Sequence, residues 1–240
     1  VFHEVWRVLR DDGTLWLNLG DSYAGSGKGR NADGSHQEGG KQGTSRGTIE
    51  GRLVKTHAAD CKPKDLIGIP WRVAFALQAD GWWLRQDIIW HKPNPMPESV
   101  KDRCTKAHEY IFLLSKSKSY WFDCDAIKEP AIYAGDNRGA RRDSRRGTRC
   151  NSMSGKTGLY RNKRSVWTVT TKPYKGAHFA TFPPDLIEPC ILAGCPEGGT
   201  VLDPFGGSGT TGEVAASEGR KAILIELNPE YVKLAHDRCG

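Results

Sequence analysis

The sequence predicts an α/β protein built on a doubly wound, mostly parallel sheet. Over residues 196–239, short apolar runs alternate with segments of helical periodicity, which is typical of strand–helix–strand units. The stretch VLDPFGGSGTT (201–211) joins one such run to its helix through a glycine-containing loop that begins with Asp203. Glu226 ends the next apolar run, near the spacing at which an acidic residue binds ribose in nucleotide-binding folds.

Apolar periodicity and turn residues predict the other elements. Helices are predicted at 1–10, 63–81 (with Asp65 as its cap), 182–195, 209–219 and 228–239. Strands are predicted at 14–20, 82–90, 109–117, 119–123, 165–169, 199–205 and 220–227. The polar, glycine-rich segment 25–48 is predicted to be a loop, and its GSGKG core does not match a phosphate-binding Walker loop.

The composition narrows the class of protein. A chain of 240 residues, 38 % hydrophobic and 26 % charged, is long enough for one globular domain with an inserted module. No apolar stretch approaches the roughly 18 residues of a membrane span. The seven cysteines form no CxxC pair, so we expect no metal site and no disulfide framework. This cysteine usage fits a reducing cytoplasm.

The positive charge is concentrated in one segment. Residues 136–164 hold ten Lys or Arg and two Asp, whereas the rest of the chain carries 25 basic and 26 acidic groups. The whole net charge of +7 therefore comes from this segment. A solvated basic loop is one interpretation. We favour a segment that binds a polyanion, because phosphate contacts supply most non-specific affinity for nucleic acid.

The loop after Asp203 has the chemistry of a site for a cationic nucleoside. Gly207 and Gly209 allow a close approach of the backbone, and the next helix points its N-terminus at the ligand. Asp203 favours a cation over a phosphate, while Glu226 is placed to bind ribose hydroxyls. S-adenosyl-L-methionine fits this description.

The motifs resemble the amino-methyltransferases of DNA, which methylate adenine N6 or cytosine N4. The resemblance is most specific in LDPFGGSGTT, IELNPEY, LWLNLGDSY, DIIWHKPNP, HEYIFLLSKS and FATFPPDLIEP. It implies the fold of S-adenosylmethionine-dependent methyltransferases with an inserted target-recognition region. The family often permutes its blocks and puts the cofactor loop near the C-terminus, which explains the late position of the loop here.

The resemblance implies a set of residues for the methyl donor. The expected cofactor-binding residues are Asp203, Phe205, Gly207, Ser208, Gly209, Thr210, Glu226, Asn228, Phe182, Pro183, Gly20 and Asp21. Glu226 is expected to bind the ribose, and Asn228 to lie beside the adenine. Residues 178–183 resemble the block that contacts the methionine part, and residues 19–22 resemble a block beside the cofactor and the target base.

The resemblance also implies double-stranded DNA as a partner. The expected DNA-binding residues are His91, Lys92, Asn94, Arg138, Arg141, Arg142, Arg145, Arg146, Lys163 and Arg164. The chain divides into a catalytic half at 1–129, a basic target-recognition insert at 130–164 and a cofactor-binding half at 165–240. A homodimer and a cognate restriction enzyme are further partners that the resemblance leaves open, in a cytoplasmic protein of bacterial, archaeal or phage origin.

One block of the family is absent from the chain. The catalytic block is Asp, Asn or Ser followed by Pro-Pro and an aromatic residue, where oxygen atoms accept hydrogen bonds from the target amine. The Pro-Pro pair of this chain, at 183–184, precedes Asp185 and belongs to another block. We therefore expect an N-terminally truncated chain whose catalytic strand precedes Val1, and the catalytic residues themselves stay unknown.

The sequence thus predicts a site-specific DNA methyltransferase that acts on the exocyclic amine of a flipped base, as in restriction–modification systems. Methylation of carbon 5 is not expected, because Cys190 and Cys195 are interpreted as structural. Two alternatives stay open: a catalytically inactive DNA-binding homologue, and a methyltransferase that acts on RNA or another substrate. The tryptophans of GWWLRQDIIW (81–90) could stack on bases, but core packing is the favoured interpretation.

Overall fold

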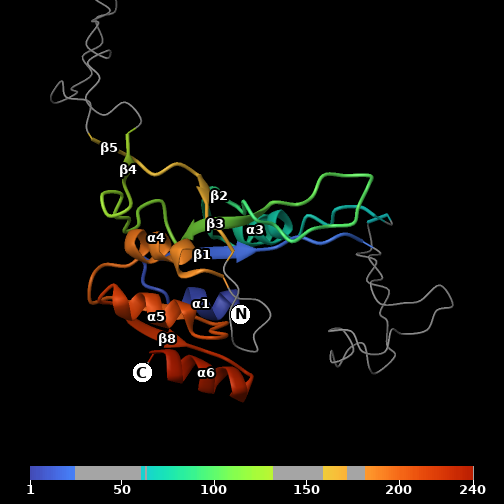
Figure 1. The fold of residues 1–240 in the computed structure, drawn as a ribbon. Helices are drawn as coiled ribbons and strands as arrows, with labels where there is room; N and C mark the ends of the chain where they lie inside the picture. The colour runs from blue at the N-terminus through green and yellow to red at the C-terminus, as the bar shows by residue number, and fades with distance from the viewer. Residues whose placement is uncertain (25–60, 63, 132–158, 172–181, 240) are drawn as a thin grey trace, which may run out of the picture.

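The computed structural model describes residues 1–24, 61–62, 64–131, 159–171 and 182–239 (Figure 1). The predicted loop at 25–48 and residues 136–158 of the basic segment lie outside the described residues. The helices are α1 (Phe2–Val8), α3 (Ile69–Ala79), α4 (Pro184–Gly194), α5 (Thr210–Ser217) and α6 (Pro229–Cys239). The strands are β1 (Thr14–Leu19), β2 (Trp83–His91), β3 (His108–Ser115), β4 (Glu129–Pro130), β5 (Tyr160–Arg161), β6 (Val166–Thr168), β7 (Thr200–Asp203) and β8 (Lys221–Leu224).

The main sheet is mixed and has the order β1-β3-β2-β6. β3 runs antiparallel to both β1 and β2, and β2 runs parallel to β6. The prediction of a mostly parallel sheet is wrong for this part. Parallel neighbouring strands need a crossover, usually a helix, and residues 92–107 between β2 and β3 contain none, so β3 runs back antiparallel to β2. The prediction is confirmed for β7 and β8, which pair in parallel with α5 as the crossover helix.

Helices cover both faces of the main sheet. On one face, α1 and α3 pack on the sheet through a buried cluster: Val5, Leu17, Ala74, Leu77, Trp82, Phe112 and Leu114. On the other face, α4 packs through a second cluster: Ile88, Trp90, Ile111, Trp167, Leu186 and Cys190. In the stretch 81–90, Trp82 and Trp90 are buried, so the core interpretation is correct for them, whereas Trp83 is 46 % exposed and does not belong to the core.

The helix α4 joins the main sheet to the C-terminal elements. Its other side packs on α5 through Ile191, Val214 and Ala215. In Figure 1, α5, β8 and α6 lie together below α4. At the end of α4, a Cβ on Gly194 would lie 2.4 Å from Trp16 Nε1, so the helix crosses β1 at a residue that has to be small.

The predicted start of one helix is wrong for an identifiable reason. The helix predicted from residue 63 begins at Ile69, because Lys64 and Gly68 both have positive φ, at 75° and 73°. Asp65 is therefore not its cap. The carboxylate of Asp21, distant in sequence, accepts a hydrogen bond from Ile69 N at 3.0 Å instead.

The strand predicted at 119–123 is not formed. The backbone amides of this segment bond to two other elements, with Trp121 N donating to Asp12 O at 2.8 Å and Asp123 N to Ala193 O at 3.0 Å. Phe122 stacks on Trp16, with ring centroids 6.2 Å apart. The aromatic pattern that predicted a strand therefore reflects packing over the end of α4 and β1.

Among the strands that the structure describes, β1, β6, β7 and β8 are edge strands. In these described ranges, β1 pairs with β3 alone, and β7 pairs with β8 alone. The catalytic strand that the family resemblance implies is not among the described strands, and it stays a prediction.

Candidate functional site

The first candidate site is the loop between β7 and α5. The side chain of Asp203 shapes this loop, because Oδ1 accepts a hydrogen bond from Phe205 N at 2.9 Å and Oδ2 accepts one from Thr211 Oγ1 at 2.5 Å. The loop ends at Gly209, which precedes the first residue of α5 with a φ of 82°. Asp203 thus fixes the turn that presents the N-terminus of α5.

Glu226 lies directly against this loop. Its Oε2 accepts a hydrogen bond from Gly207 N at 2.9 Å, and its Oε1 accepts one each from Leu227 N and Asn228 N, both at 2.9 Å. The structure therefore places Glu226 against the glycine loop, as the spacing between Asp203 and Glu226 in the sequence predicted. The carboxylate is held in one position between the end of β8 and the glycine loop.

The two glycines of the loop serve different purposes. Gly207 and Gly209 both have positive φ, at 52° and 82°, where a residue with a side chain is strained. A Cβ on Gly209 would also lie 2.8 Å from Ala235 Cα in α6. The sequence predicted that both glycines admit a ligand. The structure shows that Gly209 is also needed for close packing between α5 and α6.

Sequence reasoning missed a buttressing arginine in the last helix. Arg238 Nη1 donates to Thr210 Oγ1 at 2.9 Å and contacts Ser208 Oγ at 3.4 Å, while its Nε pairs with Glu213 at 2.5 Å. These bonds tie α6 to the start of α5 and to two predicted loop residues. No spacing rule could reveal a partner so far along the chain.

Sequence reasoning also missed an exposed leucine beside Glu226. Leu227 is 95 % exposed and Phe205 is 65 % exposed, and both are large apolar side chains next to the fixed carboxylate. An apolar residue immediately after the acidic strand end was the available signal. The two side chains give the site apolar surface next to its carboxylate.

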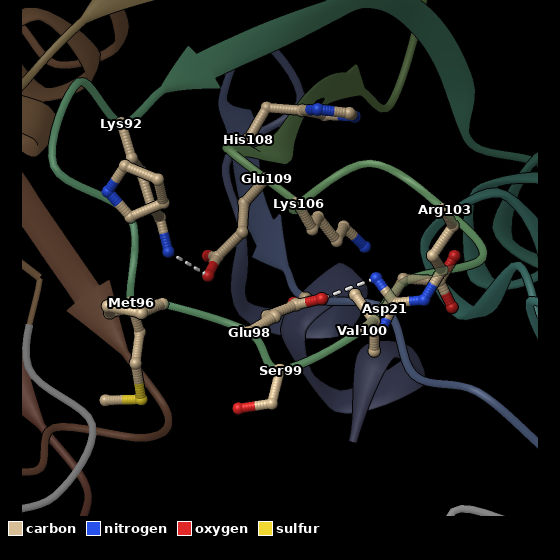
Figure 2. A pocket seen from close by; sticks show the side chains of 13 residues that line it. Asp21, Lys92, Met96, Glu98, Ser99, Val100, Arg103, Lys106, His108 and Glu109 are labelled. Atoms are coloured by element: carbon tan, nitrogen blue, oxygen red, sulfur yellow. Dashed lines mark hydrogen bonds and ion pairs between the residues drawn. The ribbon is translucent and has the colours of Figure 1, made fainter.

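The second candidate site is a cavity of about 590 Å³ at one end of the main sheet (Figure 2). Its lining includes Gly20 and Asp21 after β1, Lys92 after β2, and Glu109 in β3. The sequence predicted three of these four as site residues, from two separate motifs. The cavity is where those motifs meet.

Two ion pairs hold the walls of this cavity (Figure 2). Lys92 pairs with Glu109, and its Nζ lies 4.2 Å from the centroid of the Trp90 ring. Arg103 pairs with Glu98 at 2.5 Å and lies 3.9 Å over the ring of Tyr23. The four paired side chains are at most 28 % exposed. The walls are therefore charged but locally neutral, and each cation also rests on an aromatic face.

The other residues predicted for the rim stabilise the backbone around it. His91 Nδ1 is hydrogen-bonded to Thr168 Oγ1 at 3.2 Å. Asn94 Nδ2 donates to Thr171 O, and Thr171 N donates back to Asn94 Oδ1, both at 3.0 Å. These contacts join the segment after β2 to the segment after β6.

The remaining predicted cofactor residues lie next to α4. Phe182 packs against the cluster that α4 buries on the main sheet, and Pro183 caps the N-terminus of that helix. Asp21 lines the cavity, and its Oδ1 accepts hydrogen bonds from Ser22 N at 2.9 Å and Ile69 N at 3.0 Å. Residues 178–181 lie outside the described residues.

A short stem joins residues 129–130, which precede the basic segment, to residues 160–161 near its C-terminal end. β4 and β5 pair antiparallel, with Glu129 opposite Arg161, and Glu129 Oε1 accepts hydrogen bonds from Arg161 at 2.8 Å and Arg164 at 2.6 Å. Burial raises the pKa of Glu129, but the bonds from Arg164 and Arg161 outweigh it and hold the pKa below its ordinary value. Lys163 Nζ lies 5.1 Å from the ring of Trp167.

Five of the predicted DNA-binding residues cannot be placed. Arg138, Arg141, Arg142, Arg145 and Arg146 lie outside the described residues. They stay predictions that rest on charge alone.

Two buried cysteines, Cys190 and Cys195, are held as thiols. Burial raises the pKa of the Cys190 thiol and that of the Cys195 thiol, which keeps both as neutral thiols. In the described ranges, no group of His, Cys, Asp and Glu could hold a metal ion. No described helix is long and apolar enough to cross a membrane.

Comparison with known proteins gives concordant matches. A family model described as DNA methylase matches residues 1–237. The type II methyltransferase M.Cfr9I of Citrobacter freundii is 49 % identical over 238 residues, which are 99 % of this chain and 68 % of that protein. M.SmaI of Serratia marcescens, also a type II methyltransferase, is 48 % identical over 99 % of this chain and 71 % of its own length.

Solved structures match the fold over the whole chain. The cytosine-N4-specific PvuII DNA methyltransferase aligns with a TM-score of 0.63 at 21 % identity, covering 99 % of this chain and 67 % of that one. A DNA modification methylase of Thermus thermophilus, in complex with S-adenosyl-L-methionine, aligns with a TM-score of 0.55 at 23 % identity, covering 100 % of this chain and 73 % of that one.

Proposed function

Since the chain belongs to the DNA methylase family, we propose that it moves a methyl group from S-adenosyl-L-methionine to an exocyclic amine of a base in duplex DNA. The amine is adenine N6 or cytosine N4. The type II relatives support a site-specific enzyme of the restriction–modification kind. They do not favour an inactive DNA-binding homologue or a methyltransferase for RNA.

The observation that carries the cofactor assignment is the contact between Glu226 and the glycine loop. S-adenosyl-L-methionine supplies an electrophilic methyl group on a sulfonium. Glu226 is held beside Gly207 by a backbone hydrogen bond, which is the position from which a carboxylate accepts bonds from ribose hydroxyls. Two exposed apolar side chains accompany this carboxylate: Leu227 follows it in the sequence, and Phe205 belongs to the glycine loop. Their apolar surface suits the faces of an adenine ring.

The donor set also fits the cofactor in charge. The loop presents backbone N–H groups and a carboxylate and contains no Lys or Arg of its own, and the nearby Arg238 is neutralised by its ion pair with Glu213. The acidic groups Asp203 and Glu226 favour a cation over an anion. A methyl donor with a sulfonium meets this requirement, whereas a dinucleotide does not.

The cavity beside Gly20 and Asp21 is the proposed place of the target base. Its volume of about 590 Å³ accommodates a base with its sugar, and its polar walls can hydrogen-bond the edge of a flipped base. The Lys92–Glu109 and Arg103–Glu98 pairs keep these walls rigid. His91 and Asn94 hold the adjoining backbone, in agreement with a DNA-facing rim.

The basic segment is the proposed DNA-binding insert. Its excess of cations would contact phosphates and orient the duplex. The Glu129 stem joins its C-terminal end to the residues that precede it. We place the enzyme in the cytoplasm, where its DNA is, and a cognate restriction enzyme and a homodimer complete the proposed partners.

A labelled-methyl assay tests the function. The full-length protein is incubated with the methyl-labelled cofactor and, in parallel, with duplex DNA, RNA and protein extract. We expect label in duplex DNA alone. Label in RNA or protein would support the second alternative, and binding of cofactor and DNA with no transfer would support the inactive homologue.

A further inference from the structure

Met96 stands out among the exposed apolar side chains of the described residues. It is 86 % exposed, and it lies at the rim of the cavity proposed for the target base. In Figure 2 its side chain extends away from the Lys92–Glu109 pair. An isolated exposed hydrophobe is common on protein surfaces, so exposure alone assigns it no role.

The backbone that presents Met96 is unusually constrained. Prolines stand at 93, 95 and 97, and each fixes its own φ. Lys92 N donates to Ala107 O at 2.8 Å, and Asn94 exchanges two hydrogen bonds with Thr171. The methionine thus projects from a stiff loop. Because the loop is already ordered, little further conformational entropy is lost when a partner binds.

The surroundings of the loop suit the DNA backbone. Lys92 and Arg103 are paired with Glu109 and Glu98, and Asp102 is paired with Lys64, so the positive charge that the printed ion pairs leave beside this loop is that of Lys101 and Lys106. An apolar tip on a stiff loop, with lysines nearby that can contact phosphates, is an arrangement with which proteins insert a side chain between bases. Methionine is unbranched and polarizable, so it can fill an irregular gap in a base stack.

We propose that Met96 is a wedge that enters the duplex and fills the space left by the flipped base. This inference rests on the proposed function, because only an enzyme that flips a base leaves such a space. A base outside the stack loses its stacking and pairing energy. An apolar side chain in the gap recovers part of that loss and keeps the base from returning. Met96 is then a positioning residue, since it touches the duplex beside the reacting base.

The test uses the full-length protein and its variants on two duplexes. One duplex has a normally paired target base, and the other has a mismatch at that base, which needs less energy to flip. We expect Met96→Ala to lower kcat/KM on the paired duplex by about tenfold, and on the mismatched duplex by less than about twofold. Met96→Leu, which keeps an apolar side chain of similar volume, should retain most of the activity on both.

Val8→Ala serves as the matched control, because it truncates another exposed apolar side chain, on α1. A fluorescent base analogue at the target position gives a second measurement, since its emission rises when it leaves the stack. Met96→Ala should reduce this rise, and Val8→Ala should not.

Three results would overturn the proposal. Met96→Ala with unaltered kcat/KM would remove the role of the side chain. An equal loss on the paired and mismatched duplexes would show a general effect on binding or folding. No methyl transfer to either duplex by the unaltered protein would overturn the proposed function together with this inference, and that result is distinguishable from the first two.

Discussion

Glu226 is the residue on which the proposed cofactor site depends most. It is held by Gly207 on the loop and by the two residues that follow it, so its carboxylate is preorganised. Glu226→Gln keeps the shape but removes the charge and one acceptor. We expect the dissociation constant of S-adenosyl-L-methionine to rise by about tenfold or more, since hydrogen bonds to charged groups contribute roughly 1.5–3 kcal/mol.

Isothermal titration calorimetry with the cofactor checks this prediction. The control is Glu188→Gln, the same substitution at an exposed position of α4. If both variants bind the cofactor as the unaltered protein does, Glu226 has no part in binding.

Among the elements, α4 is the one that both halves of the fold share. It packs on the main sheet through Leu186, which is 1 % exposed, and on α5 through Ile191. We expect Leu186→Ala to lower the free energy of unfolding by about 2–5 kcal/mol, because it opens a cavity in a full core. The matched change Leu66→Ala, at a leucine that is 51 % exposed, should cost less than about 1 kcal/mol. Urea unfolding followed by fluorescence measures both, and equal losses would contradict the account of α4.

The stem of β4 and β5 depends on pH through Glu129. Its pKa is lowered in the folded protein, so the ionised carboxylate stabilises the stem above the ordinary pKa of 4.5. That contribution is lost as the pH falls below this value and through the lower folded pKa. We expect Glu129→Gln to lower the free energy of unfolding at pH 7 by about 1 kcal/mol, and the difference to vanish in acid. A series of thermal melts from pH 7 to pH 3 tests this, and a difference that stays constant with pH would refute it.

At the scale of the whole molecule, the proposed DNA affinity is carried by charge in one segment. Replacing Arg138, Arg141, Arg142, Arg145 and Arg146 by Gln should weaken binding to every duplex. It should also reduce the magnitude of the slope of log K against log salt by about 4.5, because each of five phosphate contacts contributes about 0.9. Fluorescence anisotropy over a salt series gives this slope. An unchanged slope would place the DNA contacts elsewhere.

Much of the fold, and the contact that defines the proposed cofactor site, could be predicted from the sequence, because local patterns determine them. The alternation of strands and helices from β7 to α6 follows from apolar periodicity, and the pairing of Glu226 with the glycine loop follows from spacing. The features that were not predicted depend on contacts between residues that are distant in the sequence. Asp21 caps α3, and Arg238 holds the loop from the last helix. Neither contact can be predicted from the residues that adjoin it in the sequence.

The direction of β3 was predicted wrongly and the cavity was predicted only in part, for a similar reason. The antiparallel β2–β3 pair depends on how residues 92–107 return, and that path is set by prolines and ion pairs rather than by a periodic pattern. For the cavity, the sequence predicted residues from two separate motifs but not that the motifs meet. Its far wall, with Glu98, Arg103 and Glu109, was absent from the prediction.

The central claim is that the methyl group goes to an exocyclic amine of duplex DNA. The most direct test digests DNA methylated by the full-length protein to nucleosides and identifies the labelled one by liquid chromatography and mass spectrometry. The account predicts a single labelled product, either N6-methyldeoxyadenosine or N4-methyldeoxycytidine. Label in 5-methyldeoxycytidine, or no labelled nucleoside at all, would contradict it.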